Sequence, residues 1–157
     1  MMTPATRALD AAGIHYDTAS YEHEPGEEAY GREAARKLGL DPASVFKTLL
    51  VTGPDKALRV ALVPVLRMLD LKRLAGAAGV KHLDMAPAAV AERSSGYRLG
   101  AISPVAQKRQ VPTFIDATAQ AHARIAISGG RRGFDILLSP QDLATLLGAH
   151  FVQISRD

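Results

Sequence analysis

The feature that most constrains this chain is a pair of apolar, strand-favouring segments separated by a short turn. Residues 45–52 and 57–63 are rich in apolar and β-branched residues, and Gly53-Pro54-Asp55-Lys56 between them is typical of a turn. The pair predicts a β-hairpin. The fold therefore contains a sheet.

Start and stop signals for helices surround this hairpin in the sequence. Thr3-Pro4 and Gly13 bound a helix predicted over residues 4–12, a strand follows over 14–21, and a second helix is predicted over 27–38. The later chain predicts helices over residues 70–78, with Asp70 as the cap, over 87–93, and over 141–147 after the start signal Ser139-Pro140. It predicts strands over residues 113–116, 124–128, 134–138 and 150–154. This order favours an α+β fold in one compact domain, residues 1–157, with a mixed, largely antiparallel sheet flanked by helices.

Composition excludes several classes of chemistry. The chain has 157 residues, with 47% hydrophobic and 22% charged, which is typical of a globular domain. It has no cysteine, so disulfides, thiolate metal sites, redox motifs and cysteine nucleophiles are excluded. No apolar signal core opens the chain and no apolar run is long enough to span a membrane. We expect a cytoplasmic protein without a membrane partner.

The basic residues are unevenly distributed along the chain. Residues 1–46 hold four Lys/Arg against eight Asp/Glu, whereas residues 93–132 hold seven Lys/Arg against Asp116 alone. A basic segment of this kind binds phosphate backbones by releasing counterions. Surface lysines and arginines also keep ordinary domains in solution. Charge alone leaves both interpretations open.

Lys47 is the first candidate for a functional side chain. It interrupts the apolar run Val45-Phe46-Lys47-Thr48-Leu49-Leu50-Val51, where a buried strand favours an apolar residue. A lysine at a strand edge packs its stem and exposes its ammonium, which is the structural interpretation. The functional interpretation is a point charge at the floor of a pocket, holding a phosphate or carbonyl oxygen.

Two glycine-containing loops and an aspartate are further candidates. Gly100-Ala101-Ile102-Ser103-Pro104 offers backbone N–H groups to an anion or is a plain turn. Ser128-Gly129-Gly130-Arg131-Arg132-Gly133 lacks both the P-loop and the dinucleotide-binding pattern. Asp135 is a charge in an apolar strand; it either pairs with Lys47 or bonds the preceding glycine loop.

Metal and serine-nucleophile chemistry find no support in the sequence. The five histidines show no metal-ligand spacing, and no Gly-x-Ser-x-Gly elbow is present. We therefore expect neither a metal nor a cofactor.

The order of several short motifs resembles that of the YbaK/EbsC family of Cys-tRNA(Pro) deacylases, editing proteins related to the insertion domain of bacterial prolyl-tRNA synthetases. The motifs span nearly the whole chain: Tyr21-Glu22-His23-Glu24-Pro25, Val45-Phe46-Lys47-Thr48-Leu49-Leu50-Val51, Leu69-Asp70-Leu71-Lys72, Arg93-Ser94-Ser95-Gly96-Tyr97, Gly100-Ala101-Ile102-Ser103-Pro104, Ile115-Asp116-Ala117, Ser128-Gly129-Gly130-Arg131-Arg132-Gly133 and Asp135-Ile136.

This resemblance implies a pocket for the aminoacylated 3′ end of tRNA, with Lys47 as its essential lysine. The other positions that match the family's pocket are Tyr21, Tyr30, Gly31, Thr48, Gly100, Ala101, Ser128, Gly129 and Asp135. Ala101 replaces a second glycine and Tyr30 stands where phenylalanine is usual, and both changes are expected to reshape the amino-acid pocket. From the basic segment we expect tRNA contacts by Arg93, Arg98, Arg131 and Arg132.

The implied activity is metal-independent removal of cysteine from Cys-tRNA(Pro), with the substrate's own thiol attacking the ester. Prolyl-tRNA synthetase is the second expected partner after tRNA itself. Two alternatives stay open: deacylation of Ala-tRNA(Pro) or another small aminoacyl-tRNA by water, and a non-catalytic module that binds tRNA or a synthetase.

Overall fold

The predicted hairpin is present at the centre of the molecule. A computed structural model describes residues 2–26 and 29–157, with the backbone alone for Tyr30. Strands β2 (Phe46–Thr52) and β3 (Leu58–Pro64) pair antiparallel from Phe46↔Pro64 to Thr52↔Leu58. The intervening turn is closed by the Lys56 N–H donating to the Gly53 carbonyl at 2.9 Å.

This hairpin forms the middle of a five-stranded mixed sheet in the order β5-β2-β3-β6-β9. The edge strand β5 (Asp84–Met85) is antiparallel to β2, whereas β6 (Thr113–Asp116) and β9 (His150–Val152) continue the sheet in parallel beyond β3. An antiparallel sheet β1-β8-β7 and a short pair β10-β4 complete the strands. Their bounds are β1 (Tyr16–Ser20), β4 (Met68–Leu69), β7 (Ile125–Arg131), β8 (Phe134–Leu138) and β10 (Ser155–Arg156). The predicted α+β class with a mixed, largely antiparallel sheet is confirmed.

The helices begin and end near their predicted signals. They are α1 (Pro4–Ala11), α2 (Tyr30–Leu38), α3 (Leu71–Ala78), α4 (Ala88–Ser95) and α5 (Pro140–Leu147), with short 3₁₀ helices η1 (Pro42–Ser44) and η2 (Ala117–Ala121). The side chains of Thr3, Asp70 and Ser139 cap α1, α3 and α5 as their sequence positions predict. Residues 27–28, the predicted start of the second helix, lie outside the described residues.

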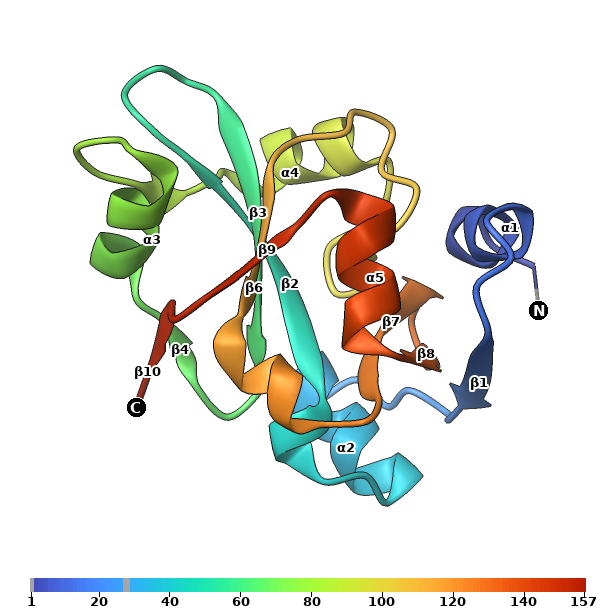
Figure 1. Ribbon diagram of the computed structural model, residues 1–157. Helices are drawn as coiled ribbons and strands as arrows, with labels where there is room; N and C mark the ends of the chain where they lie inside the picture. Colours follow the sequence, from blue (N-terminus) through green and yellow to red (C-terminus); the bar gives the residue numbers. More distant parts are fainter. Residues whose placement is uncertain (1, 27–28) are drawn as a thin grey trace.

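Two hydrophobic clusters lie on the two faces of the central sheet. Leu62 and Ile115 pack on one face with Ile127 and Ile136 of the three-stranded sheet, and Val63 packs on the other with Leu74 of α3. Figure 1 shows α3 at one side of the molecule and α1 at the opposite side, with α5 between them. Across residues 2–26 and 29–157, no helix has the length and apolar character needed to cross a membrane.

The first half of β2 lies at an open edge of the sheet. Strand β5 pairs with β2 at Val51 and Thr52, while nearer its start Val45 makes a single parallel bridge to Ala126. An edge of this kind presents backbone groups and side chains from both faces of the strand to whatever lies beside it. At this edge the five-stranded sheet and the three-stranded sheet β1-β8-β7 meet around a cavity.

Candidate active site

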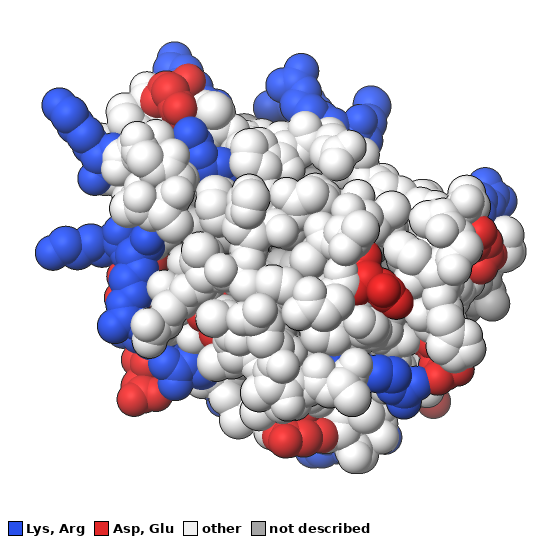
Figure 2. Space-filling model, in the orientation of Figure 1, with Lys and Arg blue, Asp and Glu red and all other residues white. Residues whose placement is uncertain are grey.

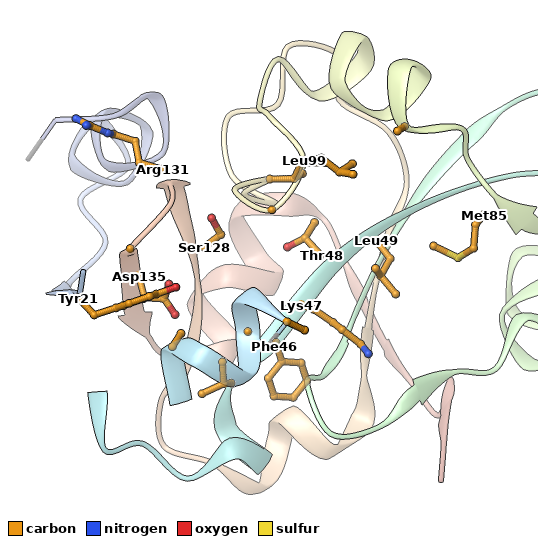
Figure 3. A pocket seen from close by; sticks show the side chains of 18 of the residues that line it. Tyr21, Phe46, Lys47, Thr48, Leu49, Met85, Leu99, Ser128, Arg131 and Asp135 are labelled. Atoms are coloured by element: carbon orange, nitrogen blue, oxygen red, sulfur yellow. The ribbon is translucent and has the colours of Figure 1, made fainter. Parts of the chain in front are cut away.

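A cavity of about 420 Å³ lies along the open edge of β2. Its walls come from β2, β7 and β8, from α2, and from the segments before and after α4. Among the residues that line it are Tyr21, Gly31, Lys47, Thr48, Gly100, Ser128, Arg131 and Asp135. Figure 3 shows Ser128, Asp135 and Tyr21 at one side of this cavity, Leu49 and Met85 at the other, and Lys47 and Thr48 between them. The volume suits a small ligand or one end of a larger one.

Lys47 is half-buried and lies on β2 opposite Val63. Burial, and then the positive charge of Arg32, lower the pKa of its ammonium from the usual value. No ion pair joins Lys47 to any residue that the structure describes. The strand tolerates a lysine here because its edge is open, and the ammonium is available to an anionic or carbonyl ligand.

Thr48 brings several polar groups to the same edge. Hydrogen-bonded pairs alternate along an antiparallel ladder, and the Ala86 N–H donates to the Leu50 carbonyl at 3.0 Å on the β5 side. The backbone groups of Thr48, two residues earlier, therefore face the open edge. Its Oγ1 is buried and has no hydrogen-bond partner among the described residues. A ligand in the cavity would meet both a donor and an acceptor here.

Asp135 is a buried acid that has no partner among the described residues. It lies on β8 between Ser128 of β7 and Ala19 of β1, and its side chain is 7% exposed. Within the described part of the chain its carboxyl group makes no hydrogen bond or ion pair, so it bonds neither Lys47 nor the glycine loop. Burial raises its pKa to about 7. Figure 3 shows the Lys47 side chain extending away from Asp135.

Two glycines shape the wall on the side of Asp135. A Cβ at Gly31 would lie 2.3 Å from Val65 Cγ1, and one at Gly133 would lie 2.3 Å from the Tyr21 carbonyl oxygen. Gly133 also has a positive φ of 77°, and its carbonyl accepts the Tyr21 N–H at 2.9 Å. These close approaches hold α2 and Tyr21 against the cavity.

Of the two glycine-loop positions after α4, only the first reaches the cavity. Gly100 lines it, with a φ of 84° that glycine adopts readily. Ala101 does not line it: its side chain is buried, and its N–H donates to the Arg98 carbonyl at 2.9 Å. The methyl group that replaces the family's second glycine therefore faces the core rather than the ligand space.

The loop around Ser128 is fixed by contacts from distant parts of the chain. A bulge shifts the β7–β8 register between Ser128 and Arg131, and the Ser128 Oγ accepts the Gly130 N–H at 3.2 Å. Gly129 lies behind the cavity, where the hydroxyl of Thr3 donates to its carbonyl at 2.7 Å. A Cβ at Gly129 would lie 2.4 Å from the Phe134 ring. The bulge directs Ser128 and Arg131 toward the ligand space.

A buried carboxylate that sequence reasoning missed secures the loop before α2. Glu33 is 2% exposed; its oxygens accept the Glu24 N–H at 3.0 Å and lie 2.6 Å from His23 Nδ1 and 3.4 Å from Lys37 Nζ. Burial by itself raises the pKa of Glu33, but these hydrogen bonds and charges outweigh it and lower the pKa to about 2. The i,i+4 spacing of Glu33 and Lys37 is the sequence signal for half of this network.

The predicted tRNA-binding arginines are spread over more than one surface. Arg131 lines the cavity, while Arg93, Arg98 and Arg132 are exposed outside it. Arg124 of the same basic segment pairs with Asp17. In Figure 2 basic side chains stand along one side of the molecule over α3 and along its upper edge over α4. The side chain of Tyr30, another predicted pocket residue, lies outside the described residues.

The cavity is lined by the Lys47 ammonium, by the exposed Arg131, and by a hydroxyl and an acid, Thr48 and Asp135, that have no partner among the described residues. These groups suit a polar acyl group on an anionic carrier. Among the described residues, no group of three His, Cys, Asp or Glu side chains could hold a metal ion. The model of the aminoacyl-tRNA editing domain matches residues 23–146, and the chain belongs to that family.

Similar proteins agree with this assignment. A relative from Enterococcus faecalis, named as a candidate Cys-tRNA(Pro)/Cys-tRNA(Cys) deacylase, EbsC, is 34% identical over 154 residues, which are 98% of this chain and 93% of the relative. The resemblance seen in the motifs is thereby confirmed. Among solved structures, a protein described as hypothetical has a TM-score of 0.87 at 23% identity, covering 98% of this chain and 100% of the other. A candidate trans-editing enzyme for prolyl-tRNA synthetase has a TM-score of 0.84 at 22% identity, covering 100% of both chains. These two likenesses concern the fold.

Proposed function

We propose that this chain is a trans-editing deacylase that removes cysteine from mischarged Cys-tRNA(Pro). The observation that carries the proposal is the cavity on the open edge of β2, which Lys47, Thr48, Ser128 and Asp135 all line, in a chain of the editing family. The name of the Enterococcus faecalis relative supports the choice of amino acid and tRNA. In this proposal residues 1–157 work as one editing domain in the cytoplasm, where translation supplies charged tRNA.

Each polar group of the cavity has a role in this proposal. The Lys47 ammonium attracts the ester carbonyl or a neighbouring phosphate oxygen, and its charge stabilises the oxyanion that develops during attack. Asp135, which has no partner among the described residues and has a pKa of about 7, receives the α-ammonium group of the amino acid. Thr48 and Ser128 supply hydrogen bonds that orient the ester. The surrounding wall is formed by Tyr21, Gly31 and Gly100. Ala101 and Gly129 support this wall from behind, and Tyr30 precedes Gly31 in the sequence.

The proposed nucleophile is the thiol of the substrate. Its sulfur forms a bond to the ester carbonyl carbon, and the bond from that carbon to the ribose oxygen breaks. The ribose oxygen takes up the proton that the thiol has lost. Water then opens the resulting cyclic thioester. Positioning of this kind supplies several kcal/mol without a protein nucleophile or a metal. We accordingly propose metal-independent hydrolysis.

The experiment that tests this function is a panel of mischarged tRNAs with release of the amino acid as the readout. Cys-tRNA(Pro), Ala-tRNA(Pro) and Cys-tRNA(Cys) separate amino-acid from tRNA selectivity, and Ser-tRNA(Pro) replaces only the sulfur. We expect the cysteinyl esters to turn over fastest at equal occupancy. Equal rates for the seryl or alanyl ester would favour attack by water, and no release from any substrate would favour a non-catalytic binding module.

For tRNA binding we propose contacts from Arg93, Arg98, Arg131 and Arg132. Affinity should then fall by roughly 0.7 to 0.9 log units per log unit of salt for each neutralised phosphate. Replacing Arg131 and Arg132 by serine should reduce that slope, and the melting temperature of the variant separates this effect from one on folding. A flat salt response would contradict the proposal. We also propose prolyl-tRNA synthetase as a partner, testable by co-purification from cells with and without tRNA.

A further inference from the structure

Glu33 of α2 is a buried carboxylate that the proposed mechanism does not use. Of the buried carboxylates in the described part of the chain, Asp135 lines the cavity, whereas Glu33 and Asp116 do not. Removing a carboxylate from water is costly, and the cost is offset only by well-placed hydrogen bonds and opposite charges. The partners of Glu33 therefore indicate what this side chain does.

The partners of Glu33 lie on the segment 22–24, which belongs to no helix or strand. One carboxylate oxygen lies 2.6 Å from His23 Nδ1, and the other accepts the Glu24 N–H at 3.0 Å. Lys37, 3.4 Å from the same carboxylate, donates to the Glu22 carbonyl and to Glu24 Oε1. Two side chains of α2, Glu33 and Lys37, therefore fasten three consecutive residues of this segment to the helix.

The fastened segment directly follows Tyr21, a residue of the cavity wall. On its other side, the Tyr21 N–H donates to the Gly133 carbonyl at 2.9 Å. Gly31, two residues before Glu33 on α2, also lines the cavity. Figure 3 shows the Tyr21 side chain at one side of this cavity. Tyr21 is thus anchored to β8 through Gly133 and to α2 through the segment that Glu33 holds.

We propose that Glu33 is a positioning residue for deacylation, which holds Tyr21 in the cavity wall by fixing the segment 22–24 on α2. This inference rests on the proposed function. Burial by itself raises the pKa of Glu33, but the hydrogen bonds lower it to about 2, so the carboxylate stays charged near neutral pH. A glutamine has the same size, but it carries no charge and has one acceptor oxygen instead of two. Glu33→Gln should therefore release the segment.

The first measurement follows the position of Tyr21 without any substrate. Fluorotyrosine incorporated at the four tyrosines of the chain gives fluorine NMR signals, and the Tyr21 signal is assigned by its absence from Tyr21→Phe. In Glu33→Gln this signal should move toward its position in the unfolded protein. The signal of Tyr97, a core residue with 6% exposure, should stay where it is. An unchanged Tyr21 signal would overturn the inference whatever the activity.

The second measurement separates KM from kcat for deacylation of Cys-tRNA(Pro). Glu33→Gln should raise KM about tenfold and leave kcat near that of the wild type, because the binding wall is loosened while Lys47 stays in place. Lys37→Met keeps the apolar stem and removes the ties to Glu22 and Glu24. It should change KM and the Tyr21 signal in the same direction, and it should add little to Glu33→Gln in the double variant.

Asp116 provides a matched control for a buried, hydrogen-bonded carboxylate. It is 1% exposed, accepts the Ile154 and Ser155 N–H groups at 2.9 Å each, and does not line the cavity. Asp116→Asn should lower the melting temperature at least as much as Glu33→Gln, yet leave KM and the Tyr21 signal unchanged. An equal rise of KM in Asp116→Asn would show that general destabilisation, rather than positioning, explains the effect of Glu33.

The two measurements distinguish failure of this inference from failure of the proposed function. If the wild type deacylates no mischarged tRNA, the proposed function is refuted, whereas a Tyr21 signal that moves in Glu33→Gln still supports the hold of Glu33 on Tyr21. A normal KM in Glu33→Gln, with deacylation by the wild type, refutes the positioning role. If circular dichroism shows Glu33→Gln unfolded, Lys37→Met carries the test, and an unchanged Tyr21 signal in that variant overturns the inference.

Discussion

Asp116 and Asp135 are both buried aspartates on strands, yet their surroundings differ in kind. At the end of β6, Asp116 is 1% exposed, and its Oδ1 accepts the N–H groups of Ile154 and Ser155, each at 2.9 Å. Its Oδ2 accepts the Thr118 hydroxyl at 2.5 Å. Asp135 is almost as buried at 7% exposure, but its carboxyl group faces the cavity without a partner in the described residues.

The pKa values of the two groups follow this difference. Burial alone raises the pKa of either acid, and for Asp135 nothing opposes it, so the pKa reaches about 7. For Asp116 the hydrogen bonds from Thr118, Ile154 and Ser155 outweigh burial and lower the pKa. Burial therefore does not distinguish a structural acid from a functional one. The distinction is whether the protein itself satisfies the carboxylate.

The largest effect on stability is expected at Asp116. Asp116→Ala leaves the Ile154 and Ser155 N–H groups and the Thr118 hydroxyl without their acceptor, and should lower the free energy of unfolding by about 3 to 5 kcal/mol. The melting temperature should fall by roughly 10 °C. Calorimetry of this variant beside Asp84→Ala, an exposed aspartate on β5, provides the matched control. An equal, small effect at both positions would show that the hydrogen bonds to Asp116 do not stabilise the fold.

Substitution of Asp135, in contrast, is expected to raise the free energy of unfolding at high pH. Its folded pKa of about 7 lies above the ordinary 3.8, so the folded state retains the proton that the unfolded state has lost. Stability from this group is complete below pH 3.8 and is lost as the pH rises through about 7. Asp135→Asn should therefore stabilise the protein at pH 8 by up to about 4 kcal/mol.

The same variant should lose deacylation activity, because an amide does not neutralise the substrate's α-ammonium. Urea unfolding at pH 4 and pH 8 measures the stability difference, which should be small at pH 4 and large at pH 8. A variant that is destabilised at pH 8 would show that Asp135 has a structural partner after all.

The smallest effect on stability is expected at Thr3, whose hydrogen bond to Gly129 supports the loop behind the cavity. The Thr3 hydroxyl donates to the Gly129 carbonyl and also accepts the Thr6 N–H at 3.2 Å as the cap of α1. Thr3→Val should cost about 1 kcal/mol of stability and raise KM for deacylation by allowing the Ser128 loop to move. Thr3→Ser keeps the hydroxyl and is expected to behave as wild type. A serine variant as impaired as the valine variant would argue against the hydrogen bond.

Local signals predicted much of this fold. The hairpin of β2 and β3 and the caps Thr3, Asp70 and Ser139 depend on residues close together in sequence, and the structure has all of them. Strands β4, β5 and β10 were not predicted because two residues are too few to show alternation.

Local sequence signals also predicted part of the candidate site. A charge within an apolar strand identified Lys47 and Asp135 from sequence alone. That Asp135 bonds neither Lys47 nor the glycine loop follows from the register of β8 against β7 and β1, which local sequence does not determine. Glu33 escaped notice because its burial, rather than its residue type, distinguishes it from a surface carboxylate.

The central claim is that the cavity residues serve catalysis rather than folding, and Lys47 tests it most directly. Deacylation of Cys-tRNA(Pro) by Lys47→Ala should be measured beside its circular dichroism and melting temperature. We expect a loss of roughly 10² to 10³ in rate, the usual consequence of removing one preorganised charge at a reacting carbonyl, with stability close to that of wild type. Lys47→Arg should rescue poorly because a planar guanidinium does not replace a point charge. Near-normal deacylation by Lys47→Ala, or a loss that accompanies unfolding, would contradict the account.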